Sequence, residues 1–390
     1  MASIPYGRQS ISQDDIDAVV SVLQSDWLTQ GPAVPRFEQA VMAATGAKYA
    51  VATNSATSAL HIACLALGLK QGDYLWTSPN TFVASSNCAL YCGASVDFVD
   101  IDSRTYNLCP EKLEAKLIQA KKENTLPKIV VPVHFAGQSC DMAAIYKLSQ
   151  EYGFHIIEDA SHAIGGRYLN RPIGGGDYAD ITIFSFHPVK IVTSAEGGMA
   201  VTNNPELAEK LGLFRSHGIT REPSLMSNAA QDPIHGQWYY QQVELGYNYR
   251  MTDLQAALGA SQMTRLTDFL TARHRLAARY DTLLKDLPLT LPWQHPDTYS
   301  AYHLYVVRLQ LDKTNNNRKA VYEALRRANI ITNVHYIPVY TQPYYQKLGF
   351  KAGHCPNAEQ HYSEAISIPL YPTLTDDQQE QVIKVITESL

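Results

Sequence analysis

Short apolar runs alternate with helix-like segments between residues 49 and 215. The runs predict strands at residues 49–53, 74–77, 96–99, 129–133, 155–158, 181–184 and 199–202. Helical periodicity predicts helices at residues 56–67, 80–91, 110–123, 141–152 and 205–215. Strongly apolar strands alternating with helices are typical of an α/β fold with a mostly parallel sheet covered on both faces. In such sheets ligands bind beyond the carboxyl ends of the strands.

Two further helices are expected before the first strand. One should start at Ser12, with Asp15 as a capping-box carboxylate, and run to about Ser25. The other covers residues 36–45 and stops at Gly46.

The pattern changes after Thr252. A long helical stretch at 253–287 is followed by a strand-like run at 302–311, a helix at 318–328, strand-like runs at 331–336 and 366–369, and a helix at 376–388. This order predicts a large domain at residues 1–260, with an N-terminal helical segment, and a smaller α+β domain at 261–390. The boundary is soft because one helix could belong to both parts.

Composition is that of a globular protein, with 45% apolar and 18% charged residues among 390. The net charge of −5 lacks the electrostatic footprint of a nucleic-acid binder. Six cysteines are too few for a disulfide scaffold, and the thirteen histidines form no H-x-x-x-H pair with a third ligand, so we expect reduced thiols and no metal site.

The sequence also predicts a cytoplasmic protein without a membrane partner. The N-terminal residues lack the apolar region of a signal peptide. Two stretches without charged residues, 49–69 and 74–96, are long enough to span a bilayer. Both are rich in Ser, Thr and Asn, and Pro79 lies in the second, so we interpret them as buried core.

The first candidate site is the segment Asn54-Ser55-Ala56-Thr57-Ser58-Ala59-Leu60, between a predicted strand and a predicted helix. Free N–H groups and the positive dipole end make such a helix start an anion site, to which hydroxyls add donors. Ordinary N-capping by Ser55 is the alternative interpretation.

The second candidate is the strand that ends in Glu158-Asp159 and is followed by Ser161-His162. A carboxylate at the end of a buried strand needs a cationic or polar partner, and a protonated pyridine nitrogen is one. Helix capping by Asp159 is the alternative.

The third candidate is Lys190, in a segment free of other charged residues up to Glu196. A lysine held in apolar surroundings has a lowered pKa and becomes a nucleophilic amine suited to Schiff-base chemistry. Most lysines are instead solvated surface charges.

The fourth candidate is the segment 246–251, which carries Asn248 and Arg250. Arginine offers a planar fork for phosphate or carboxylate. A loop with a surface ion pair is the alternative.

These four features, in this order, resemble the fold-type I aminotransferases that use pyridoxal 5′-phosphate (PLP), in particular the family that acts on sugar nucleotides. The pattern S-F-H-x-x-K-x-x-T-x-x-E-G-G at residues 185–198 is the most specific part of the resemblance. Residues 27–32 and 335–338 extend it over nearly the whole chain. The resemblance implies a mostly parallel seven-stranded sheet with helices on both faces, plus a smaller C-terminal α+β domain.

The resemblance also implies roles for individual residues. Lys190 would bind PLP covalently and act as the catalytic base, and Asp159 would pair with the pyridine nitrogen. His162 would lie near the phenolic oxygen of the ring, and Phe82 would stack on the ring face. The phosphate would be held by Ser55, Ala56, Thr57 and Ser185, and by Asn248 of a neighbouring subunit, so that the enzyme would be a homodimer with shared active sites.

A UDP-sugar and an amino donor, L-glutamate, are the implied substrates. The sugar nucleotide would contact Tyr6, Asp26, Trp27, Leu28, Thr29, Ala56, Ser185, Asn248, Arg250, Asn333, Val334, His335 and Tyr336. Within the family the motifs are most similar to the pseudaminic acid branch, which aminates C4 of a UDP-4-keto-6-deoxy-N-acetyl-hexosamine. Ala56-Thr57 and His162 depart from many other relatives, which have Gly-Thr and Gln at these positions.

Three alternatives stay open. The enzyme could aminate a 3-keto sugar or a 4-keto sugar of different stereochemistry. A PLP-dependent sugar dehydratase is less consistent with the sequence, since that branch carries His where this chain has Lys190. A sugar-nucleotide-binding protein without catalysis would not need Lys190, Asp159 and Ser185 together.

Overall fold

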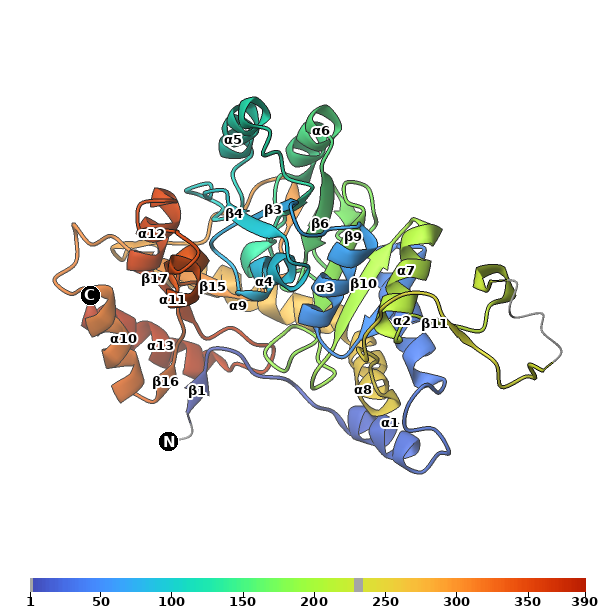
Figure 1. Cartoon of the computed structure of the whole chain (residues 1–390). Helices are drawn as coiled ribbons and strands as arrows, with labels where there is room; N and C mark the ends of the chain where they lie inside the picture. The colour runs from blue at the N-terminus through green and yellow to red at the C-terminus, as the bar shows by residue number, and fades with distance from the viewer. Residues whose placement is uncertain (1–2, 228–233) are drawn as a thin grey trace.

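The computed structural model describes residues 3–227 and 234–390 (Figure 1). Its centre is a seven-stranded sheet with the order β2-β10-β9-β6-β5-β3-β4. The strands are β2 (Tyr49–Thr53), β3 (Tyr74–Thr77), β4 (Ser95–Phe98), β5 (Ile129–Val131), β6 (His155–Asp159), β9 (Ile181–Ser185) and β10 (Gly198–Thr202). Only β10 within this sheet runs antiparallel to its neighbours. The predicted α/β class and mostly parallel sheet are confirmed.

Helices cover both faces of this sheet. They are α1 (Gln13–Leu23), α2 (Ala33–Thr45), α3 (Ala56–Ala66), α4 (Ala84–Tyr91), α5 (Pro110–Glu123), α6 (Met142–Tyr152), α7 (Pro205–Arg215) and α8 (Asp253–Met263). In Figure 1, α5 and α6 lie together at the top of the view, and α2, α7 and α8 lie together at the right. Helix α3 is buried along most of its length because its side chains are small and apolar.

The part of the chain that follows α8 forms a second group of strands and helices. Its strands are β13 (Leu289–Thr290), β15 (Tyr305–Leu309) and β17 (Ala365–Ile368), which make an antiparallel sheet. Its helices are α9 (Leu266–Leu284), α10 (Arg318–Arg327), α11 (Pro343–Gln346), α12 (Pro356–Glu364) and α13 (Asp376–Ser389). Two-residue strands complete the fold: β1 (Ile4–Pro5), β7 (Arg167–Tyr168), β8 (Arg171–Pro172), β11 (Ile219–Thr220), β12 (Gln241–Gln242), β14 (Thr298–Tyr299) and β16 (Ile330–Ile331).

Helix α9 connects two hydrophobic cores. Phe269 and Leu270, near its start, pack with α2, β9 and α8. Leu276 and Tyr280, further along, pack with β15, β17 and α13. The domain division at residue 260 stays a prediction.

Three predicted elements differ from the structure. Helix α4 begins at Ala84 rather than near residue 80, because the side chain of Asn80 is held by the carbonyl of Tyr106 and by the backbone N–H of Tyr336. The predicted helix 253–287 breaks between Met263 and Leu266. The predicted strand 331–336 is reduced to β16, which pairs with β1.

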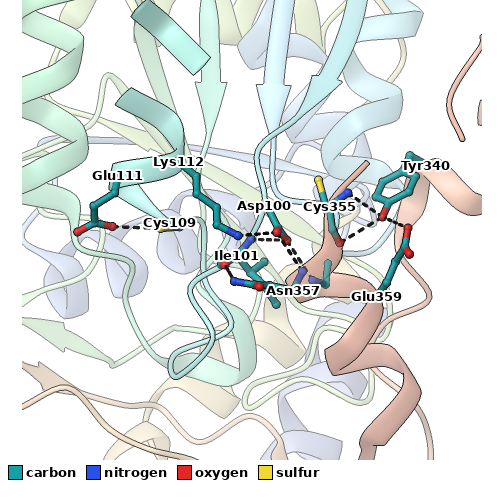
Figure 2. A network of polar contacts seen from close by, with 10 residues as sticks. Asp100, Ile101, Cys109, Glu111, Lys112, Tyr340, Cys355, Asn357 and Glu359 are labelled. Atoms are coloured by element: carbon teal, nitrogen blue, oxygen red, sulfur yellow. Dashed lines mark hydrogen bonds and ion pairs between the residues drawn. The ribbon is translucent and has the colours of Figure 1, made fainter. Parts of the chain in front are cut away.

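A polar network joins β4 and α5 to α12 (Figure 2). The buried carboxylate of Asp100 accepts hydrogen bonds from the backbone N–H groups of Asn357 and Ala358, both 3.0 Å away, and from Lys112 Nζ at 2.6 Å. Tyr340 donates to Glu359 in the same network. Asp100 thus caps the N-terminus of α12 across the interface between the central sheet and the C-terminal helices.

No helix in the described ranges, 3–227 and 234–390, combines the length and apolarity needed to cross a bilayer.

Candidate active site

A cavity of about 620 Å³ lies at the carboxyl ends of β6 and β9, next to the N-terminus of α3. Its lining includes most of the residues that the sequence singled out. They are Tyr6, Ser55, Ala56, Thr57, Phe82, Asp159, His162, Ser185, Lys190, Asn333, Val334, His335 and Tyr336. Segments from both ends of the chain therefore meet at one site.

The other predicted residues do not line this cavity. They are Asp26, Trp27, Leu28, Thr29, Asn248 and Arg250. Their two segments run side by side, since Thr29 pairs with Thr252 and the carbonyl of Leu28 accepts from the N–H of Asp253 at 3.0 Å. Trp27 is 57% exposed and Leu28 is 47% exposed, so these two apolar side chains of the second group lie at the surface.

The N-terminus of α3 forms one wall of the cavity. Ser55 is the N-cap, and its hydroxyl accepts from the N–H of Ser58 at 3.2 Å. The first N–H groups of a helix have no partner inside the helix, so those of Ala56 and Thr57 are available to an anion. The alternative interpretation of plain capping is correct for Ser55 and does not exclude the anion site.

Gly198 allows the start of α3 to lie close to β10. It pairs with Thr53 on one side and Ser185 on the other. A Cβ at position 198 would lie 2.4 Å from the backbone nitrogen of Ala56. Only glycine leaves room for the start of α3 to sit against β10.

Asp159 ends β6 and is buried. Its Oδ2 accepts from the hydroxyl of Ser85 at 2.6 Å, and its Oδ1 accepts from the N–H of Ser161 at 3.1 Å. Both of these donors are neutral. A buried carboxylate with neutral donors still favours a cationic partner.

Lys190 is partly buried and lines the same cavity. Desolvation lowers the pKa of its amine to about 8, against the opposing attraction of Asp159. A sizeable fraction of the amine is therefore neutral, and nucleophilic, near physiological pH. The surface-charge alternative for this lysine is wrong.

Three buried histidines surround the amine in neutral form. Burial and the charge of Lys190 hold the pKa of His162 well below its ordinary value. The same two effects lower the pKa of His335 to about 3. The pKa of His303 is lowered as well, by burial first and then by nearby positive charge, which includes that of Lys190. The cavity thus holds one amine that titrates near neutrality among imidazoles that do not.

The structure adds site residues that the sequence did not reveal. Thr81, Ser85 and His303 also line the cavity. Serine and threonine in a predicted helix give no local signal of a site, and His303 precedes β15, far from every motif. The pairing of Ser85 with Asp159 joins residues 74 positions apart.

These residues fit PLP. The start of α3 suits a phosphate, and Asp159 suits a protonated ring nitrogen. The exposed ring of Phe82 at the cavity wall suits stacking on the pyridine. The side chain of His162 has a buried Nδ1 without a hydrogen-bond partner in the part of the chain described. Polar atoms of this kind need a ligand or water to satisfy them.

Comparison with known proteins gives one consistent family. Residues 9–387 match the DegT/DnrJ/EryC1/StrS aminotransferase family. The spore coat polysaccharide biosynthesis protein SpsC of Bacillus subtilis is 42% identical over 390 residues, which cover 99% of this chain and 96% of that protein.

Solved structures agree with this result. PseC of Helicobacter pylori, an aminotransferase of pseudaminic acid biosynthesis, superposes with a TM-score of 0.89 at 31% identity, over 99% of both chains. Spr1654 of Streptococcus pneumoniae, in its PLP form, superposes with a TM-score of 0.88 at 29% identity, over 100% of both chains. The chain therefore belongs to the DegT/DnrJ/EryC1/StrS family, and it is a PLP-dependent sugar aminotransferase.

Proposed function

We propose that this enzyme aminates C4 of a UDP-4-keto-6-deoxy-N-acetyl-hexosamine and so makes UDP-4-amino-4,6-dideoxy-N-acetyl-β-L-altrosamine for pseudaminic acid biosynthesis. One observation carries the reaction: the Lys190 amine, with its pKa lowered to about 8, shares a cavity with the buried carboxylate of Asp159. The choice of sugar is supported by the similarity to PseC over 99% of both chains.

In this proposal Lys190 and Asp159 are the catalytic residues. When bound, PLP supplies an electron sink for the carbon that gains or loses the amino group. Lys190 Nζ would hold the cofactor covalently and, when free, would take up and return a proton, as a pKa near 8 allows. The carboxylate of Asp159 would pair with the protonated ring nitrogen.

The cofactor is oriented by residues on three sides. Ser55, Ala56, Thr57 and Ser185 would hold the phosphate at the start of α3, and Phe82 would cover one face of the ring. His162 would lie near the phenolic oxygen and is neutral, because burial opposes a charge there. A neutral imidazole can share a hydrogen bond without adding a second positive charge next to Lys190.

The sugar nucleotide needs a homodimer in this proposal. Tyr6 and residues 333–336 contact it from the chain that carries Lys190. The pyrophosphate needs strong cationic donors, and the described residues that line the cavity include no arginine. Arg250 lies outside the cavity of its own chain, near His217 at 3.5 Å. We assign Arg250, Asn248 and residues 26–29 to the site of the partner subunit.

L-glutamate is the proposed amino donor, and the cytoplasm is the proposed compartment. Free thiols support the compartment, since Cys64, Cys88, Cys92, Cys109, Cys140 and Cys355 form no disulfide in the structure.

A second candidate is an aminotransferase for another keto sugar, either 3-keto or 4-keto with different stereochemistry. The relative SpsC favours it, since it is 42% identical and takes part in spore coat polysaccharide biosynthesis.

The test is incubation of the PLP-loaded enzyme with glutamate and a panel of keto-sugar nucleotides, with products identified by NMR. Amination of the UDP-4-keto-6-deoxy-N-acetyl-hexosamine at C4 is the expected result. Exclusive amination at C3, or of a different sugar, would support the second candidate instead. Lys190→Ala should lose the product and the visible absorbance of bound PLP together.

A further inference from the structure

Ser85 lies in the first turn of α4 and is fully buried. It follows Phe82, which is expected to stack on the cofactor ring, by three residues. Its hydroxyl donates to Oδ2 of Asp159 at 2.6 Å. The hydroxyl of Thr81, also buried, lies 2.7 Å from that of Ser85. A chain of two hydroxyls therefore leads to the carboxylate expected to hold the cofactor ring.

The direction of the hydrogen bonds between Thr81, Ser85 and Asp159 follows from the number of protons that each group can donate. A serine hydroxyl has one proton to donate, and an ionised carboxylate can only accept. The alternative acceptor for Ser85 is the carbonyl of Phe82, at 3.3 Å, which is longer and uncharged. The Ser85 proton therefore goes to Asp159, and Thr81 donates to Ser85.

These donors hold the carboxylate from two sides. Ser85 binds Oδ2, and the N–H of Ser161 binds Oδ1. A carboxylate with one donor on each oxygen cannot rotate freely, and each oxygen keeps capacity for a further donor. The group is thus oriented before any ligand arrives.

We propose that Ser85, supported by Thr81, is a positioning residue that fixes the Asp159 carboxylate for the ring nitrogen of PLP. The inference rests on the role given to Asp159 in the proposed function. It does not depend on which sugar is the substrate, since it concerns only the ring of the cofactor.

The chain offers a matched control in the next residue. Ser86 is also fully buried in α4, but its hydroxyl lies 2.6 Å from the hydroxyl of Tyr345 and is not in contact with Asp159. Ser86→Ala removes the same group from the same helix. It should lower the thermal stability and leave the affinity for PLP unchanged.

The experiment is a double-mutant cycle on the full-length protein, read as the dissociation constant for PLP and as the visible spectrum of the bound cofactor. Ser85→Ala should weaken PLP binding about tenfold, the loss expected for one hydrogen bond to a charged group. In an Asp159→Asn background the same change should weaken PLP binding less than about twofold, because the hydroxyl no longer has a carboxylate to orient. Thr81→Val should act in the same direction as Ser85→Ala, with a smaller effect, and Ser85→Thr should retain most of the affinity.

Two results would overturn the proposal. Ser85→Ala with wild-type affinity for PLP is one, and an equal loss in both backgrounds is the other. If Ser85→Ala does not fold, the same comparison with Thr81→Val decides, since that change also breaks the chain of hydroxyls. If Asp159→Asn itself leaves PLP binding and the spectrum unchanged, the role of Asp159 fails and takes this inference with it. A failure confined to Ser85 leaves that role intact.

Discussion

The hydroxyl of Tyr336 lies 3.2 Å from Nε2 of His162 and joins segments 174 positions apart. Burial, and after it the charge of Lys190, keeps the pKa of His162 well below its ordinary value. Burial and the charge of Asp159 raise the pKa of Tyr336. Both groups are therefore neutral near pH 7.

This predicts that His162 does not titrate. NMR of ¹⁵N-labelled imidazoles should show a neutral ring for His162 from about pH 5 to about pH 8, where an ordinary histidine changes charge. The exposed His155, whose pKa is raised by its hydrogen bond to Asp180, serves as the internal comparison and should titrate. An imidazolium signal from His162 near pH 6 would contradict the prediction.

The second prediction concerns the amine of Lys190. Because its pKa is lowered to about 8, the neutral amine increases about tenfold per pH unit below that value and levels off above it. Covalent capture of PLP by the cofactor-free enzyme, trapped with borohydride and mapped by mass spectrometry, should follow this curve.

The neighbouring carboxylate gives the control for that curve. Asp159 raises the pKa of Lys190, so Asp159→Asn should move the midpoint to lower pH. A midpoint near the ordinary lysine value in the wild type, or a shift to higher pH in the variant, would refute the assignment.

Subunit mixing tests whether the site is shared. A chain with Lys190→Ala and a chain with Arg250→Ala should each be inactive as homodimers. A mixed dimer would hold one site with an intact Lys190 and an intact Arg250 of the other subunit, so co-expression should restore about half the activity per mixed dimer. If mixed dimers remain inactive, Arg250 acts within its own chain. An active Arg250→Ala homodimer would mean that Arg250 does not act on the substrate.

Replacement of Arg273 should cause a large loss of stability. Its guanidinium is buried and donates through Nη1 to the carbonyls of Tyr302, His303 and Leu370. Burial lowers its pKa to about 10. Arg273→Met should cost about 3 kcal/mol of unfolding free energy, because buried carbonyls lose their donor.

The matched control lies on the same helix. Arg275 pairs with Asp376, and both side chains are more than half exposed. Arg275→Met should cost less than about 1 kcal/mol. Denaturant titration of both variants checks the pair, and equal losses would contradict the argument.

Replacement of Asp100, in the network of Figure 2, should also lower the stability of the protein. It caps α12 from outside the helix, so Asp100→Ala should destabilise the protein by about 2 kcal/mol. Lys112→Ala removes only the more exposed partner and should cost less than about 1 kcal/mol. Unfolding curves that show a larger loss for Lys112→Ala would reverse this order.

Local sequence patterns were sufficient for the central sheet, since each of its strands is an apolar run that pairs in register with its neighbours. They also singled out Asp159, at the end of a buried strand, and Lys190, in a segment with few charges, and both residues line the cavity. Their catalytic roles came from the resemblance and stay predictions. The start of α4 was not predictable, because Asn80 is held by residues 26 and 256 positions away.

Ser85 was not predictable for the same reason, since its partner lies far away in the sequence. Its neighbour Ser86 has the same residue type and the same burial, and only the fold decides which of the two faces Asp159. The break in the predicted helix 253–287 is a further case. Arg265 turns there to bind Asp15 and the carbonyl of Ser10, in a segment about 250 positions earlier.

The single reversed strand of the central sheet limits how this enzyme can evolve. Because β10 runs against its neighbours, its first residue, Gly198, sits where the helix carrying Ala56 begins. One additional methyl group there would clash with the backbone of Ser55 and Ala56 and displace the start of that helix, where we propose that the cofactor phosphate binds. A side chain at position 198 is therefore expected to weaken cofactor binding while Lys190 and Asp159 stay in place.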